Sequence, residues 1–120
     1  MDIFREFTFE AAHRLPNVPD GHKCGRLHGH SYRVEIRIAG PLDEAAGWVM
    51  DFGAIKAAWA SLDDLLDHRY LNEVDGLDNP TSENLTQWIW DRLTAWTSLP
   101  LSAVTVRETC TSGCTYRGDA

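Results

Sequence analysis

The stretch HGHSYRVEIRI, residues 28–38, decides the fold because two kinds of side chain alternate along it. One set holds the histidines with the apolar and aromatic residues: His28, His30, Tyr32, Val34, Ile36 and Ile38. The other set is polar, with serine, arginine and glutamate side chains. Strict alternation predicts a β-strand that buries one face. Both histidines therefore leave the strand on its buried side.

A second strand is predicted over residues 3–13, IFREFTFEAAH, which alternates in the same way. Its buried face carries two phenylalanines and an alanine and ends at His13. A loop with two prolines and a glycine, residues 15–23, separates the two strands. If the strands pair antiparallel, His13 meets His28 and His30 at one edge of the core.

Two amphipathic helices are predicted in the centre of the chain. Asp51 is the expected N-cap of the first, which begins near Phe52. Thr81 is the expected N-cap of the second, where Glu83 suits the positive end of the helix dipole and Pro100 marks the stop. Helical spacing assigns the buried stripes, which are Ile55, Trp59, Leu62 and Leu66, then Leu85, Trp88, Ile89 and Trp96.

Two further strands, over residues 101–109 and 114–117, complete the chain. The element order is therefore ββααββ. This order predicts an α+β fold in which both helices cover one face of a four-stranded antiparallel sheet. The length of 120 residues fits a single domain over residues 1–120.

The composition argues against several classes of function. The formal net charge is −7, which disfavours nucleic-acid binding because such binding needs a basic surface. The apolar runs are too short to span a bilayer, and the first residues lack the basic segment and apolar core of a signal peptide. Three cysteines, an odd number, predict reduced thiols and a cytoplasmic protein.

His13, His28 and His30 together predict a zinc site. Neutral imidazoles are good zinc ligands, and three protein ligands with an open fourth position are the pattern of catalytic zinc. The alternative is that the three are ordinary polar residues near the end of a sheet. A His-Gly-His pair with a third histidine in phase on a neighbouring strand favours the metal.

The cysteines allow several interpretations. Cys24 could be a fourth zinc ligand that closes a structural site, an inert thiol, or a base or nucleophile beside a catalytic zinc. A nearby cation lowers the pKa of a thiol and so raises the thiolate fraction. The residues alone leave ligand and base equally open. Cys110 and Cys114 flank a turn and are expected to pack, with a hairpin disulfide as the alternative.

Two acidic positions also suggest function. Asp67 directly precedes His68 near the end of the first helix, and an Asp–His pair can fix an imidazole tautomer. An exposed acidic turn is the alternative for Asp67. Glu108 ends the apolar face of its strand, where it could hold the N–H groups of a ligand. A salt bridge to Arg107 or Arg117 is the simpler alternative.

The chain resembles the 6-pyruvoyl-tetrahydropterin synthase family nearly end to end, in six blocks: FTFEAAHRLP, GHKCGRLHGHSY, GWVMDF, LDHRYLN, NPTSENL and ETCTSGCTYRG. Several blocks in the right order are far more specific than any one of them. The short gap between Cys24 and His28 is similar to that of the bacterial branch that forms 6-carboxytetrahydropterin. The pyruvoyl-forming branch usually has a longer gap there.

The resemblance implies the tunnelling fold, in which ββααββ subunits join their sheets into a barrel. It implies a homohexamer, a dimer of trimers, with active sites between subunits. The implied activity converts 7,8-dihydroneopterin triphosphate and water to 6-carboxytetrahydropterin, acetaldehyde and triphosphate, on the route to queuosine. The competing hypotheses are pyruvoyl-forming activity on the same substrate and a non-catalytic module whose zinc is closed by Cys24 and three histidines.

The resemblance also implies a role for each site residue. The ligands of Zn²⁺ are His13, His28 and His30. The acid–base and catalytic groups are Cys24, Asp67, His68 and Glu108. The groups that bind the pterin and its triphosphate are Glu108, Thr81, Ser82, Lys23 and Arg26. His22 and Arg69 are further cations near the expected site.

Overall fold

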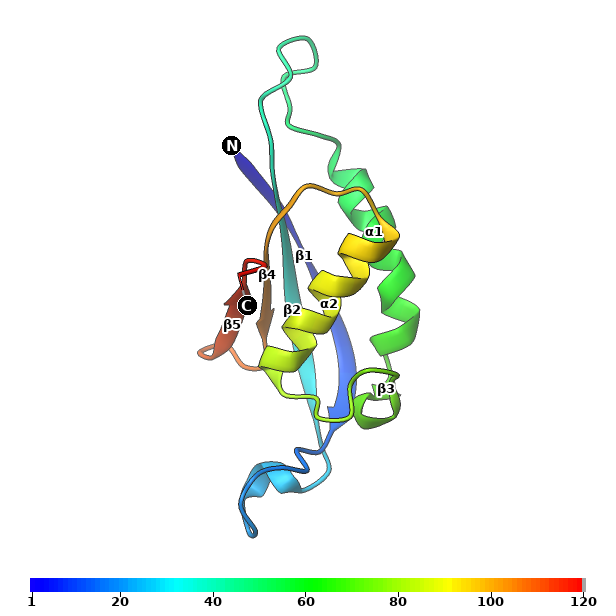
Figure 1. Cartoon of the computed structure of the whole chain (residues 1–120), viewed down its shortest axis with the longest axis vertical. Coiled ribbons are helices and arrows are strands. Elements are labelled where there is room, and N and C mark those ends of the chain that lie inside the picture. Colours follow the sequence, from blue (N-terminus) through cyan, green and yellow to red (C-terminus); the bar gives the residue numbers. More distant parts are fainter. Residues whose placement is uncertain (120) are drawn as a thin grey trace.

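The computed structural model describes residues 1–119, and it has the predicted α+β architecture. Two helices cover one face of a sheet whose strand order is β3-β1-β2-β4-β5 (Figure 1). The strands are β1 (Asp2–His13), β2 (His28–Ala39), β3 (Arg69–Tyr70), β4 (Leu101–Arg107) and β5 (Gly113–Tyr116). The helices are α1 (Phe52–Leu66) and α2 (Ser82–Trp96), with short 3-10 helices η1 (Lys23–Gly25) and η2 (Leu71–Glu73).

The two long strands pair antiparallel, as their alternation predicts. Phe7 faces Val34 and Ala11 faces His30, and the register ends with His13 opposite His28. The predicted buried faces form one core under the helices, in which the side chains of Val34 and Ile36 are fully buried. The continuous register places all three histidines at the same end of the sheet.

Both predicted helix caps are present. The Asp51 carboxylate accepts a hydrogen bond from the Gly53 N–H (2.8 Å), and the Thr81 hydroxyl accepts one from the Asn84 N–H (3.1 Å). The predicted stripes are buried except at one position. Trp96 stays 52% exposed because it lies in the last turn of α2, where its ring lies against the Arg92 guanidinium instead of the core.

The prediction of a four-stranded antiparallel sheet is wrong in one respect, because β3 adds a fifth strand parallel to β1. Two residues are too few to show alternation in a sequence. The strand forms because His68 takes a left-handed backbone conformation (φ 59°) that turns the chain from α1 toward the sheet. Its N–H then donates to the Glu10 carbonyl (2.6 Å).

The two cysteines near the C-terminal hairpin differ in their surroundings. Cys114 is half-buried against α2, with its sulfur 3.0 Å from the Thr86 hydroxyl, and burial raises the pKa of its thiol. Cys110 is exposed, so the expectation that it packs is wrong. All three cysteines are free. Within residues 1–119, neither helix has both the length and the apolar character that crossing a membrane requires.

Candidate functional site

The imidazoles of His13, His28 and His30 converge where β1 ends and β2 begins. The ring centroids of His13 lie 4.5 Å and 5.0 Å from those of His28 and His30, and the latter two are 4.8 Å apart. One ring nitrogen from each lies within 4.8 Å of the others. The two β2 histidines share one face because they are two residues apart in the strand, and the antiparallel register brings in the third.

Backbone carbonyls fix the tautomer of two of these rings. The Nδ1 atom of His13 lies 2.8 Å from the Pro80 carbonyl oxygen, and that of His28 lies 2.7 Å from the Arg26 carbonyl oxygen. A carbonyl can only accept, so both Nδ1 atoms carry the hydrogen and donate it. Both Nε2 atoms are then unprotonated, and they face each other at 3.0 Å.

This geometry fits a zinc ion. Two unprotonated nitrogens 3.0 Å apart repel each other unless a cation lies between their lone pairs. In tetrahedral zinc sites, Zn–N bonds of about 2.0–2.1 Å separate two nitrogens by about 3.3 Å. The Nε2 atom of His30 is buried and has no hydrogen-bond partner among the described residues. Burial also lowers the pKa of His13, which favours the neutral, ligand-competent imidazole.

Tyr32 lies directly beneath the cluster on the same face of β2. Its side chain is fully buried, and its hydroxyl oxygen lies 3.0 Å from the Nδ1 atom of His13. Burial, with a smaller contribution from the Glu108 charge, raises the pKa of Tyr32, so the phenol stays protonated. Its ring meets those of His13 and His30 edge to face.

Glu108 lies just past the end of β4, beside the histidines. Its two carboxylate oxygens are each 3.9 Å from an Nε2 atom, one of His13 and one of His30. The side chain is 27% exposed, so one side of it remains open to a ligand. Arg107, a salt-bridge partner considered from the sequence, lies 3.6 Å from Glu6 instead.

Asp67 and His68 form a hydrogen-bonded pair beyond the end of α1. The Nδ1–H of His68 donates to one Asp67 carboxylate oxygen (2.9 Å), and the Glu10 N–H donates to the other (2.9 Å). The Glu10 N–H, followed by His68, lowers the pKa of Asp67 and keeps it ionised. Adjacent residues can face each other here because Asp67 is the extended C-cap of α1. The His68 ring is 79% exposed, and its Nε2 atom has no hydrogen-bond partner among residues 1–119.

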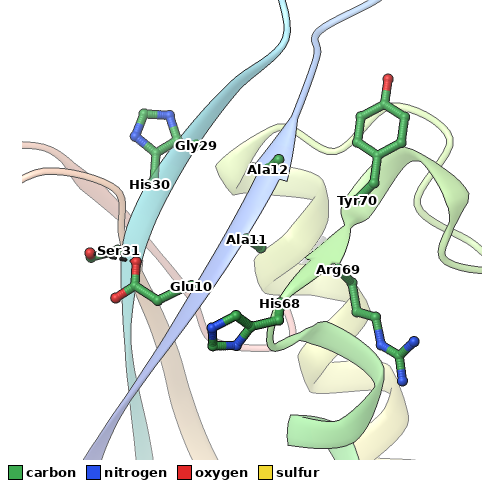
Figure 2. A pocket seen from close by; sticks show the side chains of 9 residues that line it. All are labelled: Glu10, Ala11, Ala12, Gly29, His30, Ser31, His68, Arg69 and Tyr70. Carbon is green, nitrogen blue, oxygen red and sulfur yellow. Dashed lines mark hydrogen bonds between the residues drawn. The ribbon is translucent and has the colours of Figure 1, made fainter.

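An open pocket of about 550 Å³ lies between His68 and β2. Figure 2 shows His30 and His68 among its lining residues, with the side chain of Glu10 reaching from β1 toward Ser31 on β2. The Ser31 hydroxyl donates to the Glu10 carboxylate (2.7 Å). Arg69 points away from His30, and its Nε–H donates to the Asp64 carbonyl (3.2 Å). Its guanidinium is therefore held toward α1.

Cys24 lies in η1, within the loop that joins β1 and β2. Its N–H donates to the Nδ1 atom of His22 (3.0 Å), and its carbonyl accepts from the Leu15 N–H (2.9 Å). Within residues 1–119, the cluster of possible metal ligands contains the three histidines and not this thiol. Lys23 and Arg26 flank Cys24 on the exposed surface of the same loop.

Thr81 and Ser82 are both half-buried at the start of α2. The Thr81 hydroxyl is engaged as the helix cap, and the Ser82 carbonyl accepts from the Thr86 hydroxyl (2.6 Å). Pro80, directly before them, supplies the carbonyl that holds His13. The segment that contains Thr81 and Ser82, which is expected to line a pterin pocket, is therefore hydrogen-bonded through Pro80 to the possible metal ligand His13.

Four contributions to the site were not foreseen from the sequence. The Tyr32 ring was placed on the correct face by alternation, but its bond to His13 was not anticipated. Glu10 and Ser31 were assigned to the solvent face, and nothing in the sequence indicated that they meet. The Pro80 carbonyl is a backbone group, so no residue type in the sequence indicates its role. Its hydrogen bond to His13 joins residues 67 positions apart.

Comparison with known proteins confirms the resemblance seen in the sequence. Residues 2–119 match the 6-pyruvoyl tetrahydropterin synthase family. A 6-carboxy-5,6,7,8-tetrahydropterin synthase from Synechocystis sp. is 45% identical over 95% of this chain and 91% of the relative. The 6-pyruvoyl tetrahydrobiopterin synthase of Drosophila melanogaster is 35% identical over 97% of this chain and 79% of its own length. The solved structure of Caenorhabditis elegans 6-pyruvoyl tetrahydropterin synthase superposes with a TM-score of 0.91 at 30% identity, covering 99% and 96% of the two chains.

Proposed function

The chain belongs to the 6-pyruvoyl tetrahydropterin synthase family, and from this premise we propose that it is a zinc-dependent carbon–carbon lyase. The proposed reaction converts 7,8-dihydroneopterin 3′-triphosphate and water to 6-carboxy-5,6,7,8-tetrahydropterin, acetaldehyde and triphosphate. It would serve the biosynthesis of 7-deazaguanines such as queuosine. The name and 45% identity of the cyanobacterial relative support the carboxy-forming activity over the pyruvoyl-forming one.

The observation that carries the proposal is the convergence of three imidazole nitrogens with two facing lone pairs. His13, His28 and His30 would hold the zinc through these nitrogens. The bound ion would supply Lewis-acid polarisation of the oxygens on the substrate side chain. Glu108, 3.9 Å from two of the nitrogens, places a carboxylate beside the proposed zinc.

Proton transfer is assigned to Cys24 and to the Asp67–His68 pair. Asp67 stays ionised and accepts from the Nδ1–H of His68, so the free Nε2 of His68 is the basic atom. Cys24 carries the second acid–base group, on the loop that leads into the two β2 ligands. Two groups from different elements can serve opposite faces of one substrate.

Substrate binding is assigned to side chains around this centre. The Glu108 carboxylate suits the donor edge of a pterin, where ring N–H and amino groups form charge-assisted hydrogen bonds. Thr81 and Ser82 would line the ring, and Lys23 and Arg26 would meet the triphosphate. Arg69 is the weaker candidate for phosphate, because its guanidinium is bonded toward α1.

We also propose a homohexamer in the cytoplasm, a dimer of trimers with active sites between subunits. Several large apolar side chains are about half-exposed in the single chain and would be covered by neighbours: Phe4, Leu42, Trp48, Phe52 and Trp96. Strand β3 pairs only with Ala11 and Ala12 of β1, so most of the outer edge of β1 presents unpaired backbone groups with which another subunit would pair. Three free thiols suit a reducing compartment.

Product analysis tests the proposed reaction. Zinc-loaded protein is incubated with dihydroneopterin triphosphate, and acetaldehyde and pterin products are quantified. Stoichiometric acetaldehyde with 6-carboxytetrahydropterin is the expected result. A pyruvoyl product without acetaldehyde would replace the proposal with its sister activity, and no turnover would remove the enzymatic assignment.

A further inference from the structure

We propose that Tyr32 is a positioning residue for the metal centre. Its hydroxyl and its ring hold the orientation of His13, whose tautomer is set by the Pro80 carbonyl, and thereby set how tightly the three histidines hold a metal ion. This inference rests on the proposed function in one respect: it takes the histidine cluster as the metal site. None of the roles assigned above involves Tyr32.

The hydrogen-bond geometry at His13 carries the first step. Its Nδ1 atom faces two oxygens, the Pro80 carbonyl at 2.8 Å and the Tyr32 hydroxyl at 3.0 Å. His13 can offer a lone pair at Nε2 only when Nδ1 carries the hydrogen. The Pro80 carbonyl can only accept, so Nδ1 carries the hydrogen, and the Tyr32 hydroxyl oxygen then meets Nδ1 as a second acceptor of the same hydrogen. The two contacts together hold the ring with its Nε2 lone pair toward the cluster.

The ring of Tyr32 carries the second step. It packs edge to face on His13 (5.8 Å, 89°) and on His30 (5.5 Å, 75°), and it stacks on Phe9 (4.9 Å, 11°). The side chain is fully buried, so neither its ring nor its hydroxyl is free to move. One residue thus limits the rotation of two proposed ligands.

The burial of the contact carries the third step. His13 is 1% exposed, so water cannot replace a lost partner at Nδ1 without entering the core. The Pro80 acceptor belongs to the backbone and remains when side chains change. Tyr32 is therefore the side chain through which this support can be removed. Loss of such a partner of a metal-bound histidine lowers metal affinity by about 10–100-fold.

The test compares Tyr32→Phe with wild-type protein. The substitution deletes the hydroxyl and keeps the ring, so packing against Phe9 is preserved. Tyr116→Phe is the matched control. Tyr116 lies in β5 and packs on Trp90 of α2, so this substitution removes a hydroxyl outside the histidine cluster. The zinc dissociation constant is measured by competition with a chelator, and the visible spectrum of the cobalt-substituted protein reports ligand geometry.

We expect Tyr32→Phe to weaken zinc binding about tenfold, the low end of the range because the Pro80 carbonyl remains. We also expect its cobalt spectrum to change, while Tyr116→Phe matches wild type in both. Thermal unfolding of each variant with and without zinc separates a metal effect from a folding defect. A smaller zinc-induced rise in melting temperature for Tyr32→Phe supports the inference even if its metal-free form is less stable.

Equal zinc affinity and equal cobalt spectra for Tyr32→Phe and wild type would overturn the inference and leave the proposed reaction standing. Failure of the proposed reaction can also be told apart from failure of the inference about Tyr32. If wild-type protein makes no acetaldehyde but binds zinc more tightly than Tyr32→Phe, the reaction fails and the positioning role stands. A wild-type protein that binds no zinc would overturn both.

Discussion

At the scale of single residues, substitution of Cys24 distinguishes the proposed enzyme from a non-catalytic module in which this thiol is the fourth zinc ligand. Its thiol lies outside the cluster of possible ligands, so Cys24→Ala should leave zinc content and melting temperature unchanged. Turnover should fall by about 10²–10⁴-fold, the usual contribution of a positioned acid–base group. Cys110→Ala, which alters an exposed thiol, is the control. Loss of zinc together with stability in Cys24→Ala would instead identify Cys24 as a ligand.

His13 gives the metal-free protein a pH dependence of defined sign. Burial places its folded pKa below the ordinary value of 6.5. Between these two values the unfolded chain binds a proton that the folded chain does not, so stability falls as pH falls through this window. Urea unfolding of metal-free protein at pH 7.5 and 5.5 should show the loss at the lower pH. In His13→Gln the free energy of unfolding should depend less on pH. An unchanged pH dependence would show that other groups cause it.

At the scale of elements, Thr81 has a structural role that can be separated from substrate binding. Its hydroxyl caps α2, so Thr81→Ala should lower the free energy of unfolding by about 1 kcal/mol. Thr81→Ser keeps the oxygen and should retain stability. Urea unfolding measures the first effect, and the Michaelis constant of both variants measures contact with the pterin. Wild-type stability in Thr81→Ala would show that the cap contributes nothing.

The sequence was sufficient for the elements that repeat a pattern over many residues. Alternation over β1 and β2 determined the faces, and the faces brought His13 to His28 and His30. Capping chemistry located the starts of both helices at Asp51 and Thr81. Each of these features is local, so the residues that cause it stand next to one another in the chain.

The sequence was insufficient where a contact joins distant backbone or a very short element. Strand β3 has no period to detect, and it depends on the left-handed conformation of His68 and on the Glu10 carbonyl. The Pro80 carbonyl is a backbone group without a residue-specific signature. Trp96 fits the periodicity of α2 and is exposed all the same, because periodicity does not tell where the covering surface ends.

At the scale of the whole molecule, the arrangement of the proposed groups tests the interfacial active site. Cys24 lies in the loop between β1 and β2, while Asp67 and His68 lie beside β3 at the edge of the sheet. If each site combines groups from two subunits, mixing inactive Cys24→Ala and His68→Ala chains restores some sites. Refolding the two together should recover activity at roughly a quarter of the sites. Either variant refolded alone is the control, and no recovery on mixing would place each site within one chain.

The support of His13 by Pro80 has a consequence for the order of folding. The contact between His13 and His28 spans 15 positions and can form with the β1–β2 hairpin, whereas the contact with Pro80 spans 67. Long loops close later because their closure costs more entropy and depends on intervening structure. A refolding chain should therefore gain a weak metal site first and a tight one when α2 docks. Zinc uptake followed by a fluorescent indicator would time the docking of α2.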